Sequence, residues 1–248
     1  MLEVCVEDIS GLWAAVEGGA DRIELCSALA LGGLTPSSAL ISAAARVPVP
    51  VHVLIRPRAG DFVYDAREAD LLAADIASAV AAGLAGIVIG ASRPDATLDV
   101  ALLEKLVGVA RSAAAQRAKP IALTLHRAFD LCRKPLEALE ATIQLGFDRI
   151  LTSGGAETAL GGRTTLTALA RQTHGRIKIL AGAGINPNNV ASILATGVDE
   201  IHASCQVPLP PPDPRLIELG FIPAHTYRTT ASAVSALASA MHAWPRGS

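Results

Sequence analysis

An apolar run meets a cluster of ionisable side chains in the stretch Pro120-Ile121-Ala122-Leu123-Thr124-Leu125-His126-Arg127-Ala128-Phe129-Asp130. The apolar half predicts a buried strand, and the polar half begins where a strand gives way to a loop. A parallel strand that is buried on both faces has no packing use for His126, Arg127 and Asp130 inside it. At the C-terminal end of such a strand, the same side chains are well placed for chemistry.

Similar apolar runs alternate with helical patterns along the chain, which is typical of βα units and a parallel sheet. The predicted strands cover residues 2–6, 22–26, 51–56, 86–89, 120–126, 149–152, 177–181 and 200–203. The predicted helices cover residues 9–17, a segment opened by Thr35 and Pro36, 66–82, 100–116, 135–145, part of 165–172, 186–196 and 230–243. Eight such units in 248 residues predict an α/β protein with one (β/α)8 TIM-like barrel domain over residues 1–248.

A weak internal repeat supports the count of eight. The pattern recurs as Gly19-Ala20-Asp21-Arg22-Ile23, Gly83-Leu84-Ala85-Gly86-Ile87, Gly146-Phe147-Asp148-Arg149-Ile150 and Gly197-Val198-Asp199-Glu200-Ile201. Helix-to-strand turns favour glycine in any fold, which accounts for part of this pattern. Its regular phase before every second strand favours a closed barrel over an open sheet. The one break in composition is the stretch 207–214, with five prolines, which predicts a stiff extended loop before the last helix.

Composition excludes several classes of protein. A net charge of −2 and a pI of about 6.3 give no electrostatic footprint for nucleic acid or an anionic membrane. No apolar run is long enough for a membrane span, and the acidic start lacks the pattern of a signal peptide. We therefore expect a cytoplasmic protein whose four cysteines are thiols. The Ala-rich helix exteriors are compatible with a homodimer and equally with plain packing.

The alternation of side chains along barrel strands predicts which residues face the interior. Apolar residues must face the surrounding helices, and this requirement sets the phase of each strand. The polar and thiol side chains predicted to face inward are Glu3, Cys5, Glu24, Cys26, His52, Arg56, Thr124, His126 and His202. Branched apolar side chains fill ordinary barrel interiors, and unpaired buried charge is costly. The set therefore indicates either a functional site or a fully satisfied polar network.

Two of these inward residues are thiols on neighbouring strands. Cys5 and Cys26 lie near the ends of strands that should be about 4.8 Å apart. Thiolates select Cu(I) or Zn(II), and two thiols alone suit Cu(I) better because a structural zinc site has four ligands. The alternative is that both are small buried residues, as free cysteines usually are.

The loops at the C-terminal ends of the strands suggest an anion site. Small residues after strands seven and eight are where many barrels bind phosphate through backbone N–H groups. The candidate anion-binding residues are Arg56, Arg58, Ser153, Gly182, Gly184 and Ser204. A tight turn also requires glycine, so Gly182 and Gly184 have a purely structural alternative. No dinucleotide fingerprint, P-loop or zinc-protease motif is present, so no organic cofactor is evident.

Acid–base chemistry is the other use for the inward polar groups. His126 and Glu24 are candidate acid and base, and His202 is a second candidate base. Asp130 is expected to orient or pair with His126 or Arg127. A barrel of this kind would act on a small anionic metabolite, phosphorylated or carbohydrate-like.

Six segments appear in order along the chain: Asp21-Arg22-Ile23-Glu24-Leu25-Cys26, Gly32-Gly33-Leu34-Thr35-Pro36, Ile55-Arg56-Pro57-Arg58, Gly60-Asp61-Phe62, His126-Arg127-Ala128-Phe129-Asp130 and Leu151-Thr152-Ser153-Gly154. With their spacing, they resemble the CutC family of copper homeostasis proteins over roughly residues 1–205. The resemblance implies a TIM-like barrel, a cytoplasmic location and a role in copper handling, with Cu(I) bound by Cys5 and Cys26. Two residues depart from the family pattern, Ala59 where glycine is expected and Leu125 where phenylalanine usually precedes the histidine.

Two functions thus follow from the sequence. The first is a copper homeostasis protein that binds Cu(I) through thiols at the barrel mouth. The alternative is an enzyme acting on a small anionic metabolite, which uses more of the inward polar residues than copper does.

Overall fold

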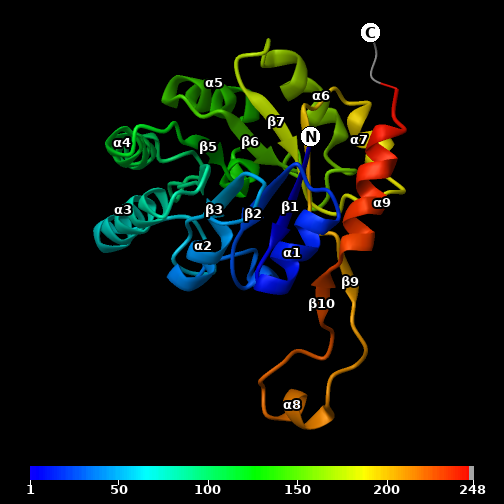
Figure 1. Cartoon of the computed structure of the whole chain (residues 1–248). Helices are drawn as coiled ribbons and strands as arrows, with labels where there is room; N and C mark the ends of the chain where they lie inside the picture. Colours follow the sequence, from blue (N-terminus) through cyan, green and yellow to red (C-terminus); the bar gives the residue numbers. More distant parts are fainter. Residues whose placement is uncertain (246–248) are drawn as a thin grey trace.

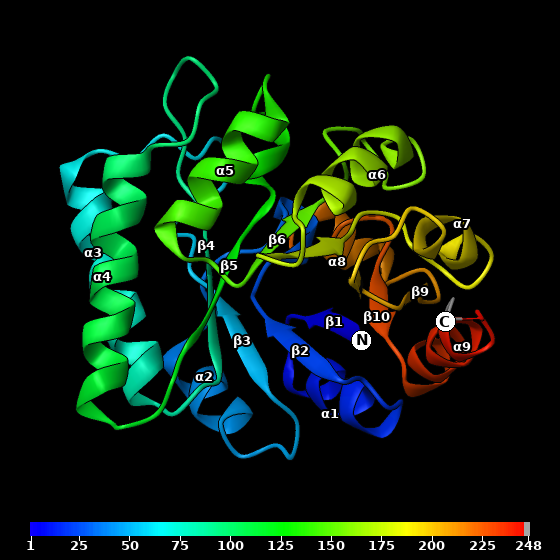
Figure 2. The same cartoon turned by 90° about the horizontal axis from the view of Figure 1, so that it is seen from above.

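A computed structural model describes residues 1–245, and its centre is a closed barrel of eight parallel strands in sequence order (Figures 1 and 2). The strands are β1 (Leu2–Val6), β2 (Arg22–Leu25), β3 (Val51–Leu54), β4 (Gly86–Ile89), β5 (Ala122–Leu125), β6 (Arg149–Thr152), β7 (Lys178–Ala181) and β8 (Glu200–Ala203). Strand β1 pairs with both β2 and β8, which closes the barrel. The prediction of a (β/α)8 barrel is confirmed.

Helices surround the barrel in the order that the βα pattern predicts (Figure 2). They are α1 (Ile9–Glu17), α2 (Ser38–Ala44), α3 (Ala66–Ala81), α4 (Val100–Gln116), α5 (Pro135–Leu145), α6 (Arg163–Gln172), α7 (Val190–Leu194) and α9 (Ala231–His242). Apolar strand residues such as Val4, Ile23 and Leu25 are fully buried against them. Within residues 1–245, no helix combines the length and the apolar character that crossing a bilayer requires.

Two predicted helix starts are wrong. Helix α2 begins after Ser37, whose hydroxyl caps it, because Thr35 instead bonds the Arg56 backbone. Helix α7 is shorter than predicted and begins after Asn189, since Asn186 and Asn189 bond the preceding turn rather than open a helix.

The proline-rich stretch is more structured than predicted. Strand β9 (Gln206–Pro208) pairs antiparallel with β10 (Tyr227–Thr229), and α8 (Pro214–Glu218) lies between them. Figure 1 shows this arm standing away from the barrel. The prolines predicted only an extended loop. The pairing partner of β9 follows about twenty residues later, beyond the stretch from which the loop was predicted.

The floor of the barrel interior holds a buried ion network. Arg22 contacts Glu3 and Glu200 with N···O distances of 2.5 Å each. Arg149 lies 3.2 Å from the same Glu200 oxygen and donates to the Thr124 hydroxyl. Two guanidinium groups thus balance two carboxylates. The inward set predicted from the sequence did not include Arg22, Arg149 and Glu200, although each directly precedes an isoleucine and so falls on the inward face of its strand.

The ion pairs of this network predict a large loss of stability when Arg22 is replaced by an uncharged residue. The substitution Arg22→Met leaves the Glu3 and Glu200 carboxylates partly uncompensated, and we expect a loss of about 3–5 kcal/mol in the free energy of unfolding. Urea denaturation measures this change. The matched control Lys105→Met breaks an exposed pair with Asp70 and should cost less than about 1 kcal/mol. Equal effects of the two substitutions would contradict a structural role for the buried network.

Candidate functional site

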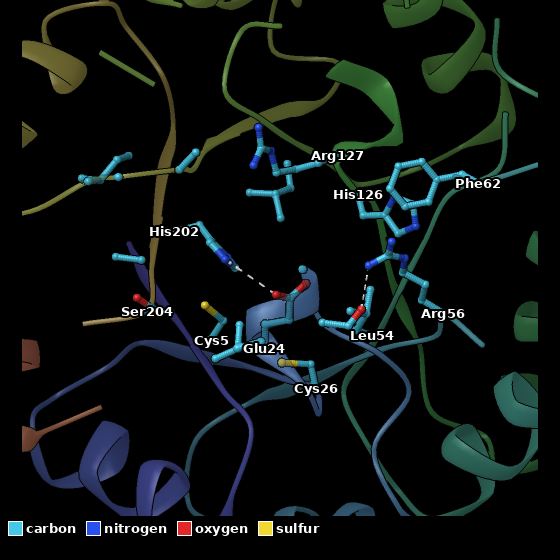
Figure 3. Close-up of a pocket in the computed structure, with 18 residues that line it drawn as sticks. Cys5, Glu24, Cys26, Leu54, Arg56, Phe62, His126, Arg127, His202 and Ser204 are labelled. Atoms are coloured by element: carbon cyan, nitrogen blue, oxygen red, sulfur yellow. Dashed lines mark hydrogen bonds and ion pairs between the residues drawn. The ribbon is translucent and has the colours of Figure 1, made fainter. Parts of the chain in front are cut away.

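A pocket of about 240 Å³ opens at the C-terminal ends of the strands. Figure 3 shows side chains from several strands converging on it. Its lining includes Cys5, Glu24, Cys26, Arg56, Phe62, His126, Arg127, Gly184, His202 and Ser204. All nine side chains predicted to face inward are buried, and six of them line this pocket.

Cys5, Glu24 and His202 form the densest group of reactive atoms in the pocket. One ligand atom from each lies within 4.8 Å of the others, and all three residues are buried. Three neighbouring strands deliver them, because β1 stands between β2 and β8 and Cys5 pairs in register with Glu24. We call Cys5, Glu24 and His202 the mouth cluster.

Glu3, a residue of the barrel floor, contacts the imidazole of the mouth cluster. Its Oε1 lies 2.8 Å from His202 Nδ1, while His202 Nε2 lies 3.6 Å from Glu24 Oε2. Burial opposes ionisation of Glu3, but the hydrogen bond from His202 and the charge of Arg22 keep its pKa well below the ordinary range. Nε2 of His202 is therefore the ring nitrogen that faces Glu24 and the pocket.

The cluster perturbs the protonation of its own members. Burial alone would lower the pKa of His202, but its interactions with Cys5, Glu24 and Glu3 raise it well above its ordinary value. Burial raises the pKa of Glu24 to about 7, although the charge of His202 acts in the opposite direction. Near neutral pH, His202 is thus an imidazolium between carboxyl groups.

Cys26 lines the same pocket but has different surroundings. Its Sγ donates to the Val6 carbonyl oxygen at 3.4 Å, and its side chain packs with Leu54 and Val88. Burial raises the pKa of this thiol far above its ordinary value, with a smaller contribution from the charge of Glu24. Cys26 is therefore held as a neutral thiol, whereas Cys5 lies among polar groups.

The opposite wall of the pocket carries His126, Arg56 and Phe62 (Figure 3). His126 Nδ1 accepts from the Ala128 backbone N–H at 3.1 Å, which leaves the proton of a neutral ring on Nε2. That Nε2 is buried without a hydrogen-bond partner. Burial, with the charge of Arg56, lowers the pKa of His126 to about 3. The Phe62 ring lies 4.7 Å from the imidazole, centroid to centroid.

Arg56 is bound into the loops that frame this wall. Its Nη1 donates to the carbonyl oxygens of Leu31 and Gly33, and its Nη2 donates to that of Gly60. The guanidinium carbon lies 4.9 Å from the Phe62 ring centroid. Its Nε is buried and has no partner.

Of the other predicted site residues, two line the pocket and two lie outside its lining. Gly184, in a turn with φ of +69°, and Ser204 line the pocket. Arg58 lies outside the lining and pairs with Glu68 and Asp61. Gly182 lies outside the lining and close under the His202 ring, where an added Cβ would come within 3.3 Å.

Asp130 and Ser153 stabilise a loop outside the pocket lining. The Asp130 carboxylate accepts from the Ser153 backbone and hydroxyl, from Thr152 and Gly155, and from Arg127 at 2.7 Å. It therefore pairs with Arg127, one of its two predicted partners, and not with His126. Phe62 had no predicted role, although it stands in the Gly60-Asp61-Phe62 segment.

The neutral state of His126 can be tested by NMR of labelled histidine. Because its folded pKa of about 3 lies below the unfolded value of about 6.5, the ring should stay neutral, with the proton on Nε2, down to about pH 4. In that window the unfolded chain binds the extra proton, so His126 makes the protein less stable as pH falls. Replacing it by asparagine should flatten this loss in denaturation curves between about pH 6.5 and 4. An imidazolium signal from His126 near pH 6 would contradict the assignment.

Comparisons with known proteins agree on one family. The model described as the CutC family matches residues 1–207. A CutC family protein from Sinorhizobium medicae is 50% identical over 244 residues, covering 98% of this chain and 96% of the relative. One from Agrobacterium fabrum is 51% identical over 249 residues, covering 100% and 96%.

One solved structure gives the same answer. A protein from Streptococcus agalactiae, described as a candidate copper homeostasis protein CutC, superposes with a TM-score of 0.76 and 30% identity, covering 82% of this chain and 98% of that one. The thiamine phosphate pyrophosphorylase of Pyrococcus furiosus shares only the fold, with a TM-score of 0.57 and 15% identity over 97% of this chain and 95% of that one.

Proposed function

Since the chain belongs to the CutC copper homeostasis family, we propose that it binds one Cu(I) ion at the mouth cluster. The observation that carries this proposal is the convergence of a thiol, an imidazole and a carboxyl within 4.8 Å of one another in a buried pocket. Copper is here the cargo of the protein, held by side chains at the barrel mouth.

The donor set favours a soft metal. Thiolate selects Cu(I) and Zn(II), imidazole suits both metals, and Mg²⁺ and Ca²⁺ prefer oxygen ligands. A structural zinc site takes four protein ligands, while among residues 1–245 three donors meet in this cluster. Cys5 Sγ and His202 Nε2 are the proposed principal ligands, and the Glu24 carboxyl is the third donor.

Glu3 supplies the supporting interaction that a metal-binding histidine needs. Metal-binding imidazoles usually donate their other ring N–H to a carboxylate or carbonyl, which fixes the ring and the tautomer. Glu3 Oε1 lies 2.8 Å from His202 Nδ1, where it can accept this hydrogen bond. A metal on His202 Nε2 would replace the proton on that nitrogen, because a side-chain atom must be deprotonated before it can bind a metal.

Cys26 is the proposed auxiliary thiol. It lines the same pocket as Cys5, but it must first give up its bond to the Val6 carbonyl and its proton. We therefore expect Cys5 to contribute more to copper affinity than Cys26. A cytoplasmic site of action fits this chemistry, because all four cysteines are free and a reducing compartment keeps them so.

Anaerobic titration with Cu(I) against a competing chelator tests the proposal. Wild type should bind one equivalent, and Cys5→Ser or His202→Gln should abolish that tight site. Glu3→Gln should weaken it by about 10–100-fold, the usual effect of losing a supporting hydrogen bond. The matched control Cys132→Ser removes a thiol from a separate groove and should leave the affinity unchanged. A tight site that survives Cys5→Ser, or none in wild type, would contradict the proposal.

A second function, chemistry on a small anionic metabolite, is favoured by the shared pocket of Glu24, His126 and His202. Neutral His126 would donate its Nε2 hydrogen bond to the acid group of the substrate and hold it in place, while Glu24 takes a proton from a carbon next to the substrate carbonyl. Pyruvate in D2O is a simple probe of this reaction. Wild type should exchange the methyl protons at least tenfold faster than His126→Asn, as followed by NMR. Equal exchange rates in the two proteins would argue against an enzymatic role for this pair.

A further inference from the structure

Arg56 is a buried cation without a carboxylate partner among residues 1–245. Its side chain lies in the pocket wall with the residue only 6% exposed. The buried Arg22 and Arg149 both contact Glu200, whereas Arg56 donates only to three backbone carbonyl oxygens and stacks on Phe62. A buried unpaired charge is unfavourable unless something compensates it.

The guanidinium also has donors to spare. A guanidinium carries five N–H groups, and three of those on Arg56 are used by the carbonyl oxygens of Leu31, Gly33 and Gly60. The N–H on Nε and one N–H on Nη2 remain. An arginine with two free N–H groups can bind a planar carboxylate through two parallel hydrogen bonds.

His126 adds a third donor on the same wall. The residue is 4% exposed, and its Nε2 has no partner. Because Nδ1 accepts from Ala128, the neutral ring carries its proton on this Nε2. The ring contacts Phe62, which also stacks under Arg56, so the two unpartnered donors flank one aromatic ring (Figure 3). Buried donors are rarely left unpaired, which points to an acceptor that a ligand brings.

We propose that Arg56 and His126 form a binding site for the carboxylate of a small organic acid. The carboxylate oxygens accept from Arg56 and from His126 Nε2, and Phe62 packs against the group that they hold. This inference deepens the second function proposed above by naming its ligand class, and it needs neither copper nor any residue of the mouth cluster.

The charges favour a monoanion over a phosphate. Arg56 offers one uncompensated positive charge, whereas a phosphate ester carries nearly two negative charges at neutral pH. The nearby Arg127 is paired with Asp130, and Arg58 is paired with Glu68 and Asp61. No second unpaired arginine therefore lines the pocket among the residues that the structure describes.

The size of the pocket limits the rest of the ligand. About 240 Å³ corresponds to roughly eight waters at the bulk share of about 30 Å³ each. Leu54 and Leu151 form apolar parts of the lining. The mouth cluster lies across the pocket from Arg56 (Figure 3). A short organic acid with a polar group at the far end fits these surroundings.

Ligand-detected NMR and calorimetry on protein stripped of metal by a chelator test the site. The probes are lactate, pyruvate and glycerate, with lactamide as the neutral match to lactate and inorganic phosphate as the competing anion. At least one of the three acids should bind wild type at least tenfold more tightly than phosphate, and lactamide should not bind.

Two substitutions locate the binding. Arg56→Lys keeps the charge but loses the paired N–H groups, and we expect at least a tenfold loss of affinity. The control Arg58→Lys makes the same change at a residue outside the pocket lining and should leave the affinity unchanged. If Arg56→Lys fails to fold by circular dichroism, His126→Asn takes its place, with the same expected direction.

The outcomes separate this inference from the copper proposal. Binding of an acid to metal-free wild type that is lost in Arg56→Lys supports it, whatever the copper titration gives. Tighter binding of phosphate, equal binding of lactamide, or no binding of any of the three acids would overturn it. Equal losses in Arg56→Lys and Arg58→Lys would also overturn it, because they would report general surface charge.

Discussion

The Glu3 carboxylate is the group on which both the barrel floor and its mouth depend. One oxygen accepts from Arg22 and the other lies against His202. A fully buried carboxylate is tolerated because both of its oxygens have positively charged partners. The same carboxylate fixes the His202 ring so that Nε2 faces the pocket. The stability of the core and the chemistry of the site therefore share one side chain, and neither can change independently of the other.

Two buried histidines in this pocket have opposite protonation because their neighbours differ. His202 stands among acidic groups and holds its proton, whereas His126 stands beside Arg56 and stays neutral. Burial favours the neutral form of both rings, so the neighbouring charges decide the difference. One side of the pocket therefore holds the protonated His202 among acidic groups, and the other side holds the unpaired N–H donors of Arg56 and His126. A pocket with two such sides suits a ligand with two chemically different ends better than a bare ion.

Side-chain alternation predicted which residues face the interior, but not how high along the barrel axis each one stands. The nine residues predicted to face inward are all buried. Height depends on the register between strands, and alternation within one strand carries no information about register. The sequence predicted a site at Cys5 and Cys26, and the register adds Glu24 and His202 beside Cys5, while Cys26 lines the same pocket. Alternation also puts Arg22 on the face of Glu24 and Glu200 on the face of His202, but only the strand pairing shows that Arg22 and Glu200 meet in the barrel floor.

The two proposed ligands differ in their effect on the charge of the pocket. Copper at the mouth cluster replaces the proton on His202 Nε2 and leaves the charge of that ring unchanged. An organic acid on Arg56 compensates a buried positive charge. A pocket that served copper alone would gain nothing from the buried, unpaired Arg56 and would bear its cost. The presence of Arg56 across from the thiol therefore argues that an anion is part of whatever this barrel does with its cargo.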